Sequence, residues 1–485
     1  MSATRRPDRA LYLALDQGGH ASRALVFDAN GLIVASDLQS LTVSHPQPAR
    51  VEHNPHELIT SLRTAMSNAI AQLGTRGKDI VSAGLATQRS SLACWDNSGM
   101  ALSPILSWQD RRAHEELHAF ENQRQMIHHK TGLFLNAHYG ASKLRWCLDH
   151  LPAVCAARHN GTLIGGPLAS FVLFHLLEER PLFSDPANAS RTLLWNIHTR
   201  NWDDELLAPF GIPRSVLPDC VPTRYNFGHL RINDLMIPLT LSNGDQSSAL
   251  FAFGEPQADT AYINIGTGAF VQRVTQQRPD HARLLTSIAM QTAQHTTYTL
   301  EGTVNGAGSA LQWACQILHL SDIESSMENW LTHSTTPPLF LNGVSGLGAP
   351  FWIADFHSRF IGTSASCDEP WEKMLAVIES IVFLLHTNLR QMESVCSTDT
   401  RAIIISGGLA TLNGLCQRLA DLCGLPVQRP AECEATARGT AFLLAGQPHH
   451  WHAAHEHAFG ITFTPTSNPA LQERYRLWHD SMQPP

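Results

Sequence analysis

The chain has 485 residues, of which 43% are hydrophobic and 16% are charged, and its formal net charge at pH 7 is -8. This composition excludes a disordered chain and supplies enough apolar residues for two large domains or three smaller ones. The acidic balance argues against nucleic acid as a partner, and no apolar run approaches the ~20 residues of a membrane span.

The chain begins with a predicted hairpin. A strand is expected over residues 11–16, ending in Asp16, and two more over 24–27 and 32–35. The basic stretch Met1–Arg6 precedes an apolar run that a strand explains better than a signal peptide. The turn between the first two strands is rich in glycine and exposes N–H groups that can hold an oxyanion, although on this stretch alone a plain hairpin loop is the favoured interpretation.

A helix and a strand follow. Asn54, Pro55 and Glu57 have the pattern of a helix N-terminus, and apolar residues then recur at helical spacing up to Leu73. The next strand is predicted over residues 80–87. Arg89 stands just beyond its carboxyl end, where it is suited to hydrogen-bond polyol hydroxyls or to lie solvated in a loop.

Two groups of histidines have a composition that could indicate a metal site. His114–His118 matches the His-Glu-x-x-His pattern of zinc proteases, but the third ligand and the protease context are missing, so we expect a charged surface helix. A solvated connector explains the late histidines better than a metal site. These are His449, His450, His452, His455 and His457.

Near the middle of the chain, Asp245 follows a strand-like run over residues 235–241 and precedes a helix-compatible run over 247–253. A carboxylate at the carboxyl end of a strand, between two halves of similar size, stands where a cleft is expected. Such a group can accept a proton from a substrate hydroxyl, or it can simply cap the following helix.

The second half repeats the plan of the first. A strand over residues 260–265, a glycine turn over 266–269 and a return strand over 270–274 match the opening hairpin, which predicts a duplicated domain. A long helix is expected over 371–392 and a buried strand over 403–405. Gly407 and Gly408 then open another helix, where glycine lets a ligand approach the backbone. A last helix is expected over 435–444.

Motifs in the same order resemble the FGGY carbohydrate kinases, with glycerol kinases as the nearest members. The resemblance covers about residues 10–480 and rests on nine motifs. They are Asp16-Gln17-Gly18, Gln88-Arg89, Trp108-Gln109-Asp110, Lys143-Leu144-Arg145-Trp146, Gly244-Asp245-Gln246, Gly266-Thr267-Gly268, Gly308–Trp313, Gly346–Trp352 and Ser406-Gly407-Gly408.

The resemblance implies an α/β fold of two actin-like (ribonuclease H-like) domains with a cleft between them. We place the boundary between 1–247, the sugar- or polyol-binding domain, and 248–485, the nucleotide-binding domain. The implied roles are as follows. Asp245 is the base and Asp16 lies by Mg²⁺; the polyol is bound by Arg89, Ser90, Trp108, Tyr139, Gln246 and Phe270; ATP is bound by Gly18, Gly19, Ser22, Arg23, Thr267, Gly308, Gln312, Gly408 and Asn413.

The sequence departs from this pattern at three places, one of which is Leu412, where an Asn is often found and where Asn413 stands next to it. Glycerol kinases usually continue Asp-Gln-Gly with Thr-Thr-Ser-Ser-Arg, whereas Gly19-His20-Ala21 stands here. Their Arg-Glu pair is here Arg89-Ser90, so we expect glycerol to be a poor acceptor. A catalytically weak relative that senses a sugar or nucleotide is therefore left open beside an ATP- and Mg²⁺-dependent kinase.

The remaining expectations concern partners and location. Ten scattered cysteines without a Cys-x-x-Cys pair favour reduced, mostly buried thiols and a cytoplasmic location. The expected partner is a small sugar or polyol, with neither nucleic acid nor membrane, and a homodimer is left open.

Overall fold

The structure is a computed structural model that describes residues 9–277, 283–321, 324–332, 337–362, 369–431, 434–453 and 460–482. The chain divides into two compact units, each with its own sheet and core. The first comprises Met1–Pro256, Thr286–Tyr298 and Glu434–His455, and the second comprises Gln257–Leu285, Thr299–Cys433 and Glu456–Pro485. The predicted boundary after residue 247 falls inside a short helix, α8 (Asp245–Ala249), and the division of roles between the two halves stays a prediction.

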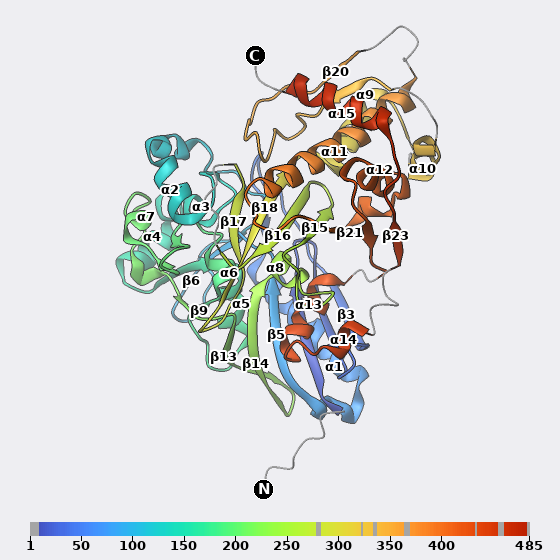
Figure 1. Ribbon diagram of the computed structural model, residues 1–485. Coiled ribbons are helices and arrows are strands. Elements are labelled where there is room, and N and C mark those ends of the chain that lie inside the picture. The colour runs from blue at the N-terminus through green and yellow to red at the C-terminus, as the bar shows by residue number, and fades with distance from the viewer. Residues whose placement is uncertain are drawn as a thin grey trace. The chain divides into compact units, whose positions relative to one another are not determined.

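A six-stranded mixed sheet forms the centre of the first unit (Figure 1). Its spatial order is β13 (Arg224–Ile232), β14 (Leu235–Gly244), β5 (Ile80–Thr87), β1 (Leu11–Gln17), β2 (Ala21–Phe27) and β3 (Ile33–Ser40). The strands β1, β5 and β14 run parallel to one another, whereas β2, β3 and β13 run antiparallel to their neighbours. The predicted strands are confirmed. Because β2 begins three residues earlier than expected, the glycine turn shortens to residues 18–20.

Two helices pack on this sheet. The start of α1 (Pro55–Gln72) is as predicted, because Asn54 Oδ1 accepts hydrogen bonds from the backbone N–H groups of His56 and Glu57. This helix packs against β2 and β3. The other helix, α13 (Ala435–Leu444), has the predicted bounds and packs against β1, β5 and α8 (Figure 1). A segment from near the end of the chain thus completes the first unit.

A smaller sheet of the first unit supports the segment that contains Trp108. Its order is β4 (Glu52–His53), β7 (Ile105–Leu106), β6 (Leu92–Asp96) and β8 (Leu163–Pro167). The motif Lys143-Leu144-Arg145-Trp146 lies on α3 (Gly140–His150). The expected surface helix around His118 is a 3-10 helix over Glu115–Gln123.

The second unit repeats the strand plan of the first. Its sheet contains β18 (Thr296–Val304), β16 (Ala269–Thr275), β15 (Thr260–Ile265), β21 (Ala402–Ser406), β22 (Val427–Arg429) and β23 (Ile461–Phe463). As in the first hairpin, β15 pairs antiparallel with β16 and parallel with β21. The long helix α11 (Pro370–Glu393) is confirmed and buries one apolar face in the core of this unit. The repetition is what a duplicated domain requires.

Several expectations concern exposure rather than fold. Among the described residues, no helix has both the length and the apolar character to cross a membrane. Of the cysteines that the structure describes, eight are free thiols, and among these only Cys94, Cys147 and Cys416 are buried, so the expectation of mostly buried thiols is wrong for this part of the chain. The predictions for Met1–Arg6, Cys367, Cys433, His455 and His457 fall outside the described residues.

Candidate active site

The carboxyl ends of three parallel strands meet at one edge of the first unit's large sheet. Asp16 on β1 lies opposite Ala86 on β5, and Gly244 at the end of β14 lies opposite Thr87. This register brings together the segments that contain Asp16, Arg89 and Asp245. Ligand sites in open α/β sheets form at this edge, so the structure supports the predicted grouping.

Asp245 begins helix α8, and its Oδ1 accepts a hydrogen bond of 2.7 Å from the backbone N–H of Gln246. Burial raises the pKa of the Asp245 carboxyl, and the positive charge of Arg89 opposes that rise. Arg89 Nε lies 3.8 Å from Asp245 Oδ1. Gly244 makes this approach possible, since a Cβ there would lie 2.5 Å from Arg89 Cδ. The carboxylate therefore has a buried setting with a cation beside it.

A second carboxylate, Asp16, faces Arg23 across the hairpin. Arg23 Nη1 lies 3.6 Å from Asp16 Oδ2, and Arg23 Nε lies 3.5 Å from Glu434 Oε2 at the start of α13. Burial, followed by the charge of Asp245, raises the pKa of Asp16 to about 7 against the opposing charge of Arg23. The group Asp16, Arg23, Asp245 and Glu434, here called the carboxylate cluster, thus carries more negative than positive charge.

The residues predicted to bind the polyol mostly belong to the same part of the first unit. Ser90 follows Arg89 in a left-handed conformation, with φ of 66°, and its hydroxyl is buried without a hydrogen-bond partner in the described structure. A Cβ on Gly19 would lie 4.0 Å from Trp108 Nε1, which places the glycine turn next to this indole. Tyr139 is buried. Phe270 lies on β16 of the second unit.

Two functional candidates escaped the sequence analysis. Arg191 is 2% exposed, its guanidinium lies 5.2 Å from the centre of the Tyr139 ring, and its charge lowers the pKa of Asp245. Lys143 is fully buried and donates hydrogen bonds from Nζ to the backbone carbonyls of Ser90, at 3.0 Å, and His138, at 2.7 Å. Lys143 is part of a motif of the resemblance, but no role was predicted for it. No motif or local pattern marks Arg191 as a site residue.

Ser22 has a different setting from its neighbours. It is fully buried in β2, and its hydroxyl is hydrogen-bonded at 2.8 Å to the hydroxyl of Ser61 on α1. The side chain of Ser22 is therefore directed toward the helix and is already engaged. Its predicted contact with a phosphate would need its backbone rather than its hydroxyl.

In the second unit, the glycine turn is attached to the start of α9 (Gly308–Leu318). The carbonyl of Gly266 accepts a hydrogen bond from Gly308 N, and that of Thr267 accepts one from Ser309 N, both at 3.0 Å. A Cβ on Gly308 would lie 2.8 Å from the Gly266 carbonyl oxygen, so this close packing needs glycine. The structure thus brings together Thr267 and Gly308.

The other residues of the second unit that were predicted to bind the nucleotide are not linked to this turn by the contacts described above. Gln312 and Gly408 are exposed, and a Cβ on Gly408 would meet no atom within 4 Å. Asn413 begins α12 (Asn413–Cys423), and its Oδ1 accepts a hydrogen bond of 2.9 Å from Arg429 Nη2. The amide oxygen of Asn413 is therefore already engaged within the unit.

Each unit has the strand plan of an actin-like domain, and comparison with known proteins agrees. The structure superimposes on glycerol kinase with ADP from Plasmodium falciparum with a TM-score of 0.88 and 24% sequence identity, covering 97% of both chains. It superimposes on a ligand-bound xylulose kinase from Lactobacillus acidophilus with a TM-score of 0.83 and 20% identity, covering 98% of this chain and 97% of that one. The predicted two-domain actin-like fold is confirmed.

Sequence comparison defines the family. The profile of the FGGY family of carbohydrate kinases, N-terminal domain, matches residues 11–252, and that of the C-terminal domain matches residues 261–446. A glycerol kinase from Alkalilimnicola ehrlichii is 35% identical over 445 residues, which are 89% of each chain. The chain belongs to the FGGY family of carbohydrate kinases, and the predicted enzyme class, a sugar or polyol kinase, is confirmed.

Proposed function

We propose that this kinase transfers the terminal phosphoryl group of ATP to a hydroxyl of a small sugar or polyol, with Asp245 as general base. The observation that carries this proposal is the position of Asp245 at the meeting point of three strand ends, 3.8 Å from Arg89 and within the electrostatic reach of Asp16. A purified-protein screen of sugars and polyols with Mg-ATP, followed by ADP release, tests it. The sensor alternative is less favoured, because the family profiles and curated relatives are kinases.

The proposed reaction needs little covalent chemistry from the protein. As the acceptor oxygen bonds to the terminal phosphorus and the bond to the ADP oxygen breaks, the hydroxyl proton passes to Asp245. Arg89 has two effects in this arrangement: its charge opposes the rise that burial causes in the pKa of Asp245, and its Nε lies 3.8 Å from the carboxylate, which favours one position of that group. Tyr139, Trp108 and Gln246 are proposed to orient the acceptor.

The residues present fit a magnesium ion. Among the described residues, no group of three or more His, Cys, Asp or Glu side chains could hold a metal by itself. Mg²⁺ in kinases is commonly held by one or two carboxylates together with substrate phosphates, so the acidic excess at Asp16 is sufficient. We propose Asp16 as this ligand; when bound, Mg²⁺ neutralises charge on the phosphate oxygens.

The acceptor is predicted from Ser90. We expect glycerol to be phosphorylated poorly and a larger ketose or polyol to be phosphorylated better, because the buried hydroxyl of Ser90 offers no carboxylate to grip a short polyol. Ser90→Glu should improve kcat/KM for glycerol by roughly 10-fold or more, as hydrogen bonds to a charged group contribute about 1.5–3 kcal/mol each. Ser90→Ala is the matched control and should not improve it. A micromolar KM for glycerol in the unaltered enzyme would contradict this prediction.

The glycine turn over residues 18–20 gives a prediction for ATP. Gly19 and His20 stand where relatives have hydroxyl residues, so we expect weaker ATP binding than in those relatives. A Cβ on Gly19 would lie 3.7 Å from Gln88 Oε1, an ordinary contact distance, so the turn accepts a side chain. Gly19→Thr with His20→Thr should tighten ATP binding by roughly 3- to 10-fold, measured by titration calorimetry. An unchanged affinity, with Gly19→Ala as the control, would show that this turn does not contact phosphate.

A further inference from the structure

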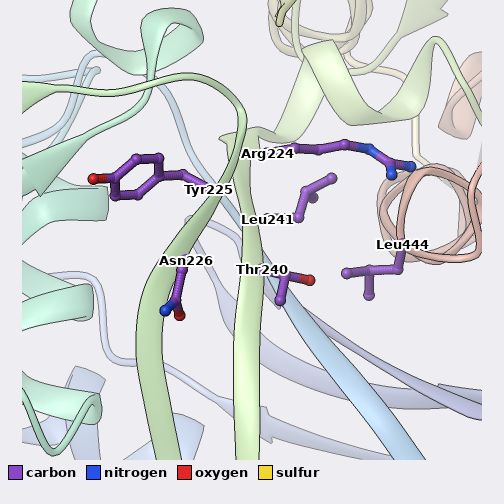
Figure 2. Close-up of a pocket in the computed structure, with 6 residues that line it drawn as sticks. All are labelled: Arg224, Tyr225, Asn226, Thr240, Leu241 and Leu444. Atoms are coloured by element: carbon purple, nitrogen blue, oxygen red, sulfur yellow. The ribbon is translucent and has the colours of Figure 1, made fainter. Parts of the chain in front are cut away.

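Buried and exposed polar side chains of the first unit have different meanings. Arg224, Tyr225 and Asn226 line a pocket beside β14 and α13, but they are exposed on the edge strand β13 (Figure 2). Water solvates them, so they do not indicate a ligand. Lys143 on α3 is the opposite case, because it is fully buried. Lysine is rarely buried to this extent, so the groups that its side chain contacts are the guide to its role.

The amino group of Lys143 links two segments that contain predicted acceptor-binding residues. Its Nζ donates a hydrogen bond of 3.0 Å to the backbone carbonyl of Ser90 and one of 2.7 Å to that of His138. Ser90 directly follows Arg89, and His138 directly precedes Tyr139. One buried side chain is therefore attached to the backbone beside both Arg89 and Tyr139.

The attachment to Ser90 holds an unfavourable backbone conformation. Ser90 has a φ of 66°, in the left-handed region that a residue with a Cβ adopts only where its surroundings hold it there. The hydrogen bond from Lys143 to the Ser90 carbonyl is one such contact. The turn in turn determines where the Arg89 side chain begins, and Arg89 Nε lies 3.8 Å from Asp245 Oδ1.

Trp108 is connected to both of the attached segments. Its backbone N–H donates a hydrogen bond of 3.0 Å to Ser91 Oγ, next to Ser90 in the turn. Its ring centre lies 5.6 Å from that of His138, which itself lies 4.9 Å from the ring centre of Tyr139. The positions of Trp108 and Tyr139 therefore both depend on segments that Lys143 holds.

Helix α3 gives Lys143 a fixed base. The backbone N–H of Ala141 donates a hydrogen bond of 2.8 Å to the carbonyl of Thr192, and the helix packs against β6 and β8. Further along the helix, the guanidinium of Arg112 lies 4.7 Å from the centre of the Trp146 ring. Because α3 is anchored on several sides, it can hold the two segments rather than follow them.

The two carbonyls need N–H donors rather than a positive charge. Burial lowers the pKa of Lys143, and the charge of Arg111 lowers it further, against the opposing charge of Asp110. A neutral amine still has two N–H groups, one for each carbonyl, and so does the side-chain amide of glutamine. A glutamine at this position should therefore replace much of the function of the lysine.

We propose that Lys143 is a positioning residue for the acceptor: it holds the backbone at Ser90 and His138 so that Arg89, Trp108 and Tyr139 face the sugar or polyol, without touching the acceptor itself. This role rests on the proposed function, because it concerns the binding of the acceptor. The attachment of the two segments to Lys143 does not rest on it.

Steady-state kinetics of Lys143→Met and Lys143→Gln in the full-length protein tests the role. Methionine is a flexible apolar side chain that suits a buried position but has no donor. With the best acceptor from the screen, Lys143→Met should raise the KM for the acceptor by at least ~10-fold, because small displacements of positioning residues are costly. The KM for ATP should stay within about twofold, and Lys143→Gln should keep the KM for the acceptor within about threefold.

Two controls separate this role from a general loss of stability. Thr131→Val removes a fully buried hydroxyl that donates a hydrogen bond of 2.7 Å to the carbonyl of Ile127, away from the two segments. It should lower the unfolding temperature without raising the KM for the acceptor. Arg224→Met replaces an exposed basic residue and should leave both quantities unchanged.

Hydrogen exchange gives a measurement that needs no turnover. Peptides that cover residues 88–91 and 138–140 should exchange faster in Lys143→Met than in the unaltered protein, and peptides that cover β1 should not. Unchanged exchange in both segments would show that Lys143 does not hold them and would overturn the proposal.

The kinetics can also overturn the proposal. An unchanged KM for the acceptor in Lys143→Met would leave Lys143 with a structural role only, and an equal rise in Lys143→Gln would show that the two N–H donors are not what matters. A lack of turnover by the unaltered protein with every acceptor would count against the proposed function instead, so the two failures are distinguishable.

Discussion

Asp245→Asn is expected to lower kcat by at least ~100-fold while leaving the fold and ATP binding intact. The amide has almost the same shape as the carboxylate and can still accept the hydrogen bond from the Gln246 N–H, but it cannot take a proton from the acceptor hydroxyl. Steady-state kinetics with the best acceptor from the screen gives kcat, and calorimetry with ATP tests whether the nucleotide still binds.

The control for this variant is Asp219→Asn. Asp219 lies in the same unit and forms an exposed ion pair with Arg214 at 2.6 Å, so it reports the general effect of removing a carboxylate. Its kcat should stay within twofold of the unaltered enzyme. Near-normal turnover in Asp245→Asn would remove Asp245 as the base and with it the proposed mechanism.

Local patterns predicted the elements that position the site. Asn54 and Pro55 determine where α1 begins through short-range capping, and the strand that ends in Asp16 is a short apolar run. Neither depends on distant parts of the chain. The placement of Asp16 near Asp245 does depend on them, and it was expected only from the family resemblance. The structure gives the reason, because Asp16 lies near the carboxyl end of β1 and Asp245 directly follows β14, a strand of the same parallel set.

Local sequence patterns could not predict contacts between residues that are far apart in the chain. The return of α13 to the first unit places Glu434 beside Arg23, although the two residues are about 400 positions apart in the sequence. Arg191 lies in a stretch without periodicity or a motif, and only the folded chain brings its charge to Tyr139 and Asp245. Lys143 has a fully buried position that its residue type does not suggest, since lysine is rarely fully buried.

Asp16→Asn is expected to lower kcat/KM by at least ~100-fold and, at the same time, to stabilise the protein at neutral pH. The loss of activity follows from the proposed role of Asp16 beside Mg²⁺. The gain in stability follows from the burial of the Asp16 carboxyl and then from the nearby charge of Asp245, which together raise the pKa of Asp16 from its ordinary value of 3.8 to about 7. A change that improves stability while abolishing activity is characteristic of a group retained for function rather than folding.

The raised pKa of Asp16 predicts that the free energy of unfolding decreases as the pH rises. Below pH ~4, Asp16 is protonated in both the folded and the unfolded chain, and it does not affect the free energy of unfolding. Between pH 4 and about 7, the unfolded chain releases this proton while the folded chain keeps it, so the free energy of unfolding falls; above 7 the loss is complete. A rise of this size in the pKa of Asp16 corresponds to a decrease on the order of a few kcal/mol in the free energy of unfolding.

Urea unfolding at pH 5 and pH 8 measures this effect. The advantage of Asp16→Asn over the unaltered protein should be larger at pH 8 than at pH 5, and Asp37→Asn on the adjacent part of the sheet controls for the loss of a carboxylate. Mg-ATP should raise the unfolding temperature of the unaltered protein more at pH 8 than at pH 6, because a cation favours the ionised carboxyl, and this difference should vanish in Asp16→Asn. Parallel stability curves for the two proteins across this range would show that Asp16 does not carry the raised pKa and that the cluster is not poised for a cation.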